Sequence, residues 1–223
     1  LVRFDKIINM KKLILFLLFI FPFLTFSQSL QLQGVIFFSV PSGGNDGKAI
    51  HLTVNDTIPN LSVYGIGVAN NAGGSDGQEY TFDSISVFPG DHILLARDIP
   101  SMTSYFDSCY IEFDYILQAT NAINQNGNDA IELFKDSVVI ETFGDVNIDG
   151  TYTCWDYYHS FAYKSLFGDS NCLGGNWIFG GVDCTDFSSN TFTSSCPYPL
   201  CSPISNIGCT DSLANNYDST AIY

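Results

Sequence analysis

The chain has 223 residues, of which 46% are hydrophobic and 15% aromatic, and its 23 acidic and 8 basic residues give a net charge of −15. From Gln28 onwards the imbalance is greater, since 22 acidic residues face only Lys48, Arg97, Lys135 and Lys164. A surface this acidic repels phosphate backbones, which are bound by clustered Lys and Arg. The composition therefore excludes a nucleic-acid-binding domain and favours cations, glycans or other proteins as partners.

The N-terminal segment predicts export. Met10-Lys11-Lys12 precedes the apolar run Leu13–Phe26, and small and polar residues follow from Ser27. A basic start, a short apolar run and a small-residue exit are typical of a secretory signal peptide over residues 10–27, cleaved after Ser27. The run is short for a membrane span and contains Pro22, although a permanent N-terminal anchor is the alternative. Residues 1–9 are then translated from upstream of the true start at Met10. After cleavage we expect no membrane-spanning segment.

The region after the signal peptide predicts an all-β fold. Runs such as Val35–Val40, His51–Val54 and Ile93–Ala96 are short and end near Gly, Pro, Asn or Asp. Several short strands separated by such turns are typical of an antiparallel β-sandwich. No segment sustains a helical apolar period over ten residues. We assign residues 28–200 to one sandwich with an irregular, cysteine-rich C-terminal tail.

A β-hairpin is predicted in the middle of the chain. Ala130–Phe134 and Val138–Phe143 are rich in β-branched and aromatic residues, and Lys135-Asp136-Ser137 between them supplies turn chemistry. Four side chains of this hairpin are expected to be largely buried: Ile131, Leu133, Val139 and Phe143.

The segment after the hairpin, Asp145–Asp156, contains the best candidate for a metal site. Counting from Asp145, oxygen-bearing side chains occupy positions one, three, five and twelve, and a glycine occupies position six. This spacing matches the front half of an EF-hand calcium loop. The candidate calcium ligands are Asp145, Asn147, Asp149 and Asp156. The alternative is an ordinary turn, in which Val146 and Ile148 point inward and the acids diverge into solvent.

The seven cysteines are consistent with an oxidising environment. The sequence has no C-x-x-C spacing and no histidine near a cysteine pair, so a zinc site at the cysteines is not expected. The first six can form three disulfides, in any of fifteen connectivities. Parity suggests a bond between Cys109 and Cys154, because the remaining four of the six lie in the tail: Cys172, Cys184, Cys196 and Cys201.

The C-terminal residues suggest a second, incomplete unit. Residues 208–222 read GCTDSLANNYDSTAI, which resembles a short acidic repeat that a second cysteine normally closes. We assign residues 201–223 to a linker and a truncated repeat, and Cys209 is expected to have lost its partner or to be a free thiol. Its oxygen-bearing residues Asp211, Asn215 and Asp218 form a second candidate cation site.

Catalysis has little support in the sequence. There is no G-x-S-x-G motif of a serine hydrolase. His51, His92 and His159 have no companions at metal-binding spacing, so each is expected to be a surface or core residue.

Several elements, in order, resemble the lamin-tail domain of secreted bacterial proteins. They are Lys48-Ala49-Ile50, the strand start in Pro59–Tyr64, the turn in Val87–Ala96, the hairpin with its following Asp149-Gly150, and Trp155-Asp156-Tyr157. The resemblance covers about Leu32–Lys164 and implies an immunoglobulin-like β-sandwich in a cell-surface setting. One departure is His51, where the family usually has an acid.

The resemblance implies two functions. The first is an exported, non-catalytic binding or adhesion module of a larger surface protein, with a protein or glycan as partner and calcium as the one candidate cofactor. The alternative is an accessory domain of a secreted nuclease or other hydrolase whose catalytic domain lies outside this chain. In both, this chain is not itself an enzyme, and the full-length reading frame would separate them.

Overall fold

A computed structural model describes residues 28–201 of the chain, apart from Ser42 and Ser170. The predicted signal peptide and start at Met10 lie outside these residues. So do Cys209 and the second candidate cation site at Asp211, Asn215 and Asp218.

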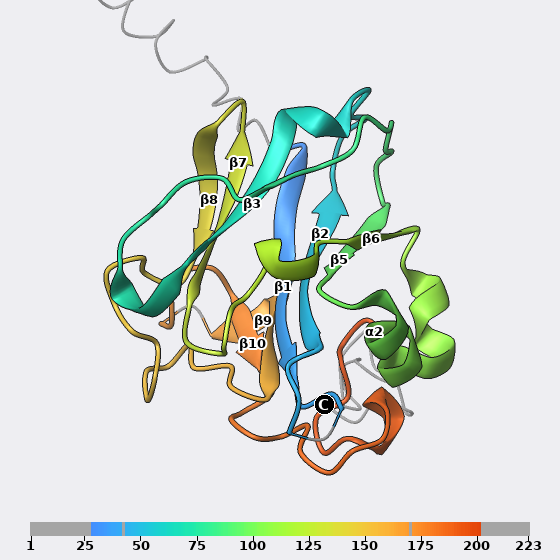
Figure 1. Cartoon of the computed structure of the whole chain (residues 1–223), viewed down its shortest axis with the longest axis vertical. Helices are drawn as coiled ribbons and strands as arrows, with labels where there is room; N and C mark the ends of the chain where they lie inside the picture. The colour runs from blue at the N-terminus through green and yellow to red at the C-terminus, as the bar shows by residue number, and fades with distance from the viewer. Residues whose placement is uncertain (1–27, 42, 170, 202–223) are drawn as a thin grey trace, which may run out of the picture.

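The fold consists of two β-sheets, which confirms the all-β prediction. The larger sheet has the order β10 (Trp177–Phe179), β9 (Ser160–Asp169), β1 (Leu30–Phe38), β2 (Gly47–Val54), β5 (His92–Ala96) and β6 (Tyr115–Gln118). The smaller sheet has the order β4 (Tyr80–Thr81), β3 (Tyr64–Ala69), β7 (Ala130–Lys135) and β8 (Val138–Phe143). In Figure 1, β7 and β8 lie on the left, β1 and β2 lie in the middle and helix α2 lies on the right. Short 3₁₀ helices occur in the connections, at Leu61–Val63, Asn70–Ala72, Asp107–Glu112, Thr120–Ala122 and Thr191–Thr193.

One strand pair is parallel, which corrects the purely antiparallel prediction. β6 pairs with β5 in parallel, because the chain crosses over through helix α2 (Ile99–Phe106) before it returns. Asp98 caps the helix by accepting a hydrogen bond from the amide of Ser101, and Pro100 occupies the first turn. The helix has 8 residues, so a search for ten-residue helical periods does not detect it.

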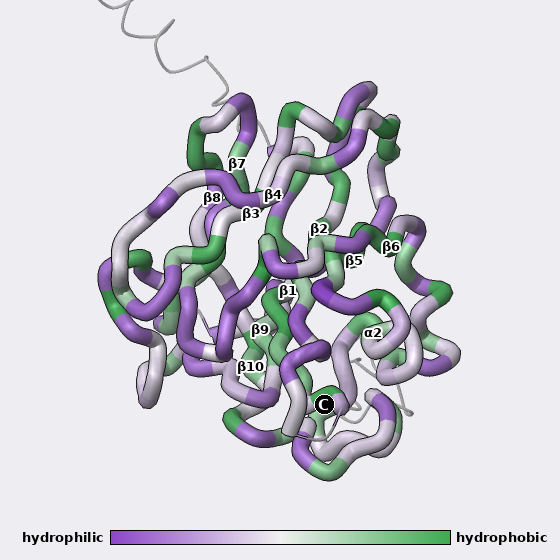
Figure 2. The backbone as a smooth tube through the Cα atoms, in the orientation of Figure 1, coloured by the Kyte–Doolittle hydropathy of each residue, from purple (hydrophilic) through white to green (hydrophobic). Residues whose placement is uncertain are grey.

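The larger sheet is covered on both faces. Its inner face packs against the smaller sheet in a core that includes Val35, Ile50 and Leu133. Its outer face packs under α2 and the C-terminal segment in a second core that includes Phe38, Phe106 and Tyr198. Figure 2 shows hydrophobic stretches along the central strands and hydrophilic residues in many of the connections. The sandwich therefore has a third, partial layer.

The hairpin is confirmed, with one error in its burial. Ile131, Leu133 and Phe143 are buried, but Val139 is 37% exposed. The pairing shifts by one residue between Leu133 and Phe134, so Val139 lies opposite Phe134 instead of a residue of the inner face. A bulge of this kind reverses the facing of the residues beyond it.

The six cysteines of the described region form three disulfides, as predicted, but Cys109 does not pair with Cys154. The bonds are Cys109–Cys201, Cys154–Cys172 and Cys184–Cys196. Cys109 follows α2 on the outer face of the larger sheet and there meets the returning C-terminal segment. Parity along the sequence does not reveal this contact, because it depends on the third layer.

Candidate functional site

The candidate site is a cavity of about 510 Å³ whose walls come from four separate connections. They follow β1, precede β7, precede β9 and follow β10. The lining residues are Phe37, Gly43, Gly44, Asn45, Asn126, Asn128, Thr151, Tyr152, Asp156, Tyr158, His159, Val182 and Asp183. The wall thus combines aromatic faces with amide, hydroxyl and carboxylate groups, as binding sites for polar ligands do.

His159 forms one end of this wall. It is 9% exposed and has a φ of 45°, a left-handed conformation that is uncommon for a residue other than glycine. Its ring stacks on Tyr158 with 4.1 Å between ring centroids and meets Phe37 edge-on at 5.2 Å. The imidazole is therefore fixed between two aromatic rings.

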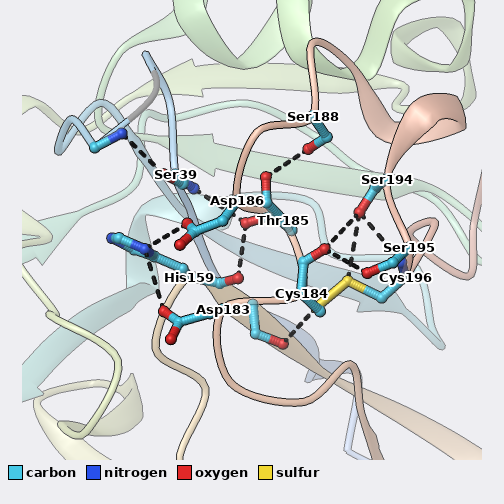
Figure 3. Close-up of polar contacts among 12 residues, drawn as sticks. Ser39, His159, Asp183, Cys184, Thr185, Asp186, Ser188, Ser194, Ser195 and Cys196 are labelled. Carbon is cyan, nitrogen blue, oxygen red and sulfur yellow. Dashed lines mark hydrogen bonds and ion pairs between the residues drawn. A yellow bond between two sulfur atoms is a disulfide. The ribbon is translucent and has the colours of Figure 1, made fainter.

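Two carboxylates face the imidazole of His159 (Figure 3). Its Nδ1 lies 2.7 Å from Oδ1 of Asp186 and 3.5 Å from Oδ1 of Asp183. Within the described part of the chain, these three residues are the one group of at least three His, Cys, Asp or Glu side chains whose ligand atoms lie within 4.8 Å of one another. They are the residues that could hold a metal.

Thr185 fixes the backbone that carries the two aspartates. Its amide and hydroxyl both donate hydrogen bonds to the carbonyl of His159, at 3.1 and 2.7 Å. Its hydroxyl oxygen also accepts a bond from the amide of Ser39, so the loop is joined to both β1 and β9. The Cys184–Cys196 disulfide anchors the same loop (Figure 3). The positions of Asp183 and Asp186 are therefore set by the surrounding fold.

The four candidate calcium ligands are not gathered in this way. Oδ1 of Asp145 accepts the amide of Asn147, and Oδ1 of Asp149 accepts the amide and hydroxyl of Thr151. The bonds from the Thr151 hydroxyl and amide hold the pKa of Asp149 below its usual value. The carboxylate of Asp156 accepts backbone amides of its own turn, and of the four residues only Asp156 lines the cavity. The four candidate ligands are thus not brought together, and the calcium loop stays a hypothesis to be tested.

The alternative prediction, an ordinary turn whose apolar side chains point inward, is confirmed only in part. Val146 is half-buried, whereas Ile148 is exposed. A Cβ atom at Gly150 would lie 2.4 Å from the ring of Trp155, so close packing explains the glycine at position six without a metal.

The group at His159 is not apparent from local sequence patterns. Asp183 and Asp186 lie far downstream of His159, and they meet it only because β9 and β10 pair. The signal in the sequence was the pair of aspartates in Asp183-Cys184-Thr185-Asp186. In the structure, the cysteine between them forms a disulfide that fixes this segment in place.

Within the described residues, no helix is long and apolar enough to cross a membrane. No protein-family model matches the chain, and no curated protein or solved structure is significantly similar to it. The lamin-tail resemblance therefore depends on its sequence motifs alone.

Proposed function

We propose that this chain is an exported, non-catalytic binding module, and that its cavity binds a glycan. The observation that carries the proposal is the combination of aromatic and polar groups in the cavity wall. Tyr152 is 97% exposed, and Tyr158 presents a second partly exposed ring. Tyrosine combines a large apolar face with a hydroxyl that forms hydrogen bonds, so it suits a ligand that presents both apolar faces and hydroxyl groups.

The polar groups of the wall support the same ligand class. Asn45, Asn126 and Asn128 offer amides, and Asp156 and Asp183 offer carboxylates. The amide nitrogen of Asn128 donates to Asp149 and Thr151, while its Oδ1 is buried without a hydrogen-bond partner. The groups open to a ligand are therefore those of the exposed lining residues Asn45, Asn126 and Asp183.

The setting of the proposal is extracellular. Three disulfides are compatible with an oxidising compartment. The two-sheet sandwich and the order of the matched motifs support an immunoglobulin-like, lamin-tail type of domain in a larger surface protein.

The test is a screen of the purified protein against immobilised oligosaccharides, followed by calorimetry with the best ligand. We expect Tyr152→Ala to weaken binding about tenfold, which corresponds to the loss of one aromatic contact of about 1.4 kcal/mol. Tyr110→Ala is the matched control, because Tyr110 is also exposed but does not line the cavity. Failure of every oligosaccharide to bind, or equal binding by Tyr152→Ala, would refute the proposal.

A further inference from the structure

We propose that His159, Asp183 and Asp186 bind a divalent transition-metal ion of the zinc class at the edge of the cavity. This inference concerns the metal alone and does not depend on which ligand the cavity takes.

The first argument is the geometry of the three ligand atoms. A tetrahedral zinc ion with bonds of 2.0–2.2 Å keeps its ligand atoms about 3.3–3.6 Å apart. The separation of 3.5 Å between Nδ1 of His159 and Oδ1 of Asp183 fits this value directly. The 2.7 Å separation from Oδ1 of Asp186 needs an opening of less than about 1 Å, which rotation of the Asp186 carboxylate would supply.

The second argument is that two of these atoms lack hydrogen-bond partners. Nδ1 of His159 and Oδ1 of Asp186 are both buried, and neither makes a hydrogen bond, although they lie 2.7 Å apart. A buried polar atom without a hydrogen bond destabilises the folded state. A shared metal ion would satisfy both atoms at once, whereas the 2.7 Å ion pair between them lacks hydrogen-bond geometry.

The three ligands are held in place before any ion arrives. His159 and Asp183 both have positive φ values, 45° and 61°. Such conformations persist where the surrounding structure enforces them. The Thr185 hydrogen bonds and the Cys184–Cys196 disulfide provide that enforcement, so little ordering entropy remains to be lost on binding.

The donor set selects the class of metal. Calcium and magnesium prefer sites made only of oxygen, whereas imidazole with carboxylates suits zinc and its neighbours. Three protein ligands leave a fourth position open. The side chain of Asp183 is 55% exposed and lines the cavity together with His159, so we place the open position on the cavity side.

The experiment is a zinc titration of the purified protein without a histidine tag. We expect one zinc per chain in calorimetry and in elemental analysis after dialysis, and a rise in Tm with zinc. Asp186→Asn and Asp183→Asn should each weaken zinc binding at least tenfold. Asp136→Asn makes the same chemical change in the exposed β7–β8 turn and should bind zinc as the unmodified protein does.

Cobalt(II) gives a readout that needs no variant. Bound in a tetrahedral site of the unmodified protein, it should give visible absorption bands that disappear when zinc displaces it. Absence of both retained zinc and the cobalt spectrum would overturn the proposal and leave an ordinary contact between a histidine and an aspartate. Unchanged zinc affinity in both Asp183→Asn and Asp186→Asn would overturn it equally.

Discussion

Nε2 of His51 lies 2.8 Å from Nδ1 of His92, across the adjacent strands β2 and β5. The two rings are diagonal neighbours on the outer face of the larger sheet, because His92 lies opposite Thr53. The other ring nitrogen of His51 contacts the hydroxyl of Tyr198 at 2.9 Å. His51 is thus buried beneath the third layer, which Tyr198 belongs to.

This pair predicts loss of stability in weak acid. Burial lowers the pKa of His51 well below 6.5, and it also lowers the pKa of His92, although the nearby Asp114, Glu112 and Asp91 act in the opposite direction. Below about pH 6.5 the unfolded chain therefore binds protons that the folded chain does not, so the free energy of unfolding decreases as the pH falls. Urea unfolding at pH 7.5 and pH 5 should show this decrease. Glutamine does not titrate in this range, so the free energy of unfolding of His51→Gln should decrease less between the two pH values. An equal decrease would show that His51 does not cause the pH dependence.

Close packing at Gly34 predicts a second effect. A Cβ atom there would lie 2.0 Å from the hydroxyl oxygen of Tyr198. Gly34→Ala must therefore displace Tyr198, and we expect a loss of about 2 kcal/mol in the free energy of unfolding. Tyr198→Phe removes the hydroxyl, so the cost of Gly34→Ala should be smaller in that background. Additive effects in this double-mutant cycle would show that the hydroxyl is not the obstacle.

The disulfides predict an order of stabilisation. Cys109–Cys201 joins residues 92 positions apart, whereas Cys184–Cys196 joins residues 12 positions apart. Because a longer closed loop restricts the unfolded chain more, replacing the first pair with serine should lower the free energy of unfolding by about 4–5 kcal/mol. Replacing the second pair should lower it by about 3 kcal/mol. Loss of Cys109–Cys201 also releases the segment that carries Tyr198, which adds to the difference. Denaturant unfolding of the two double-serine variants measures both values, and a smaller cost for the Cys109–Cys201 variant would contradict the order.

The sequence predicted the elements that depend on local chemistry. The hairpin follows from its turn, where Asp136 and Ser137 adopt positive φ values, and from the β-branched residues on either side. The exposure of Val139 was not predictable in this way, because it depends on a bulge that the pairing with β7 creates.

The features that depend on distant contacts were missed. The partner of Cys109 requires the third layer, whose residues are separated widely in the sequence. The same holds for the group at His159, because its aspartates approach only through the β9–β10 pairing. The EF-hand spacing of Asp145–Asp156 was a local pattern, but hydrogen bonds within its own turns engage its carboxylates.

The last prediction concerns calcium at that loop. Asp149 accepts hydrogen bonds from Asn128 and from the amide and hydroxyl of Thr151, and a calcium ion would have to compete with these donors. Calcium also needs six to eight oxygen ligands, whereas the four candidate side chains turn to separate local partners. We expect calorimetry of the purified protein to show no heat of calcium binding that depends on Asp149.

Asp149→Ala is the decisive variant for this loop. It removes the acceptor of the Thr151 and Asn128 hydrogen bonds, so its Tm should fall slightly, and by the same amount with and without calcium. Asp136→Asn again serves as the control for loss of one exposed charge. The opposite result would be a rise in Tm with calcium in the unmodified protein but not in Asp149→Ala. It would establish the calcium loop, because only a bound ion would make the effect of calcium depend on Asp149.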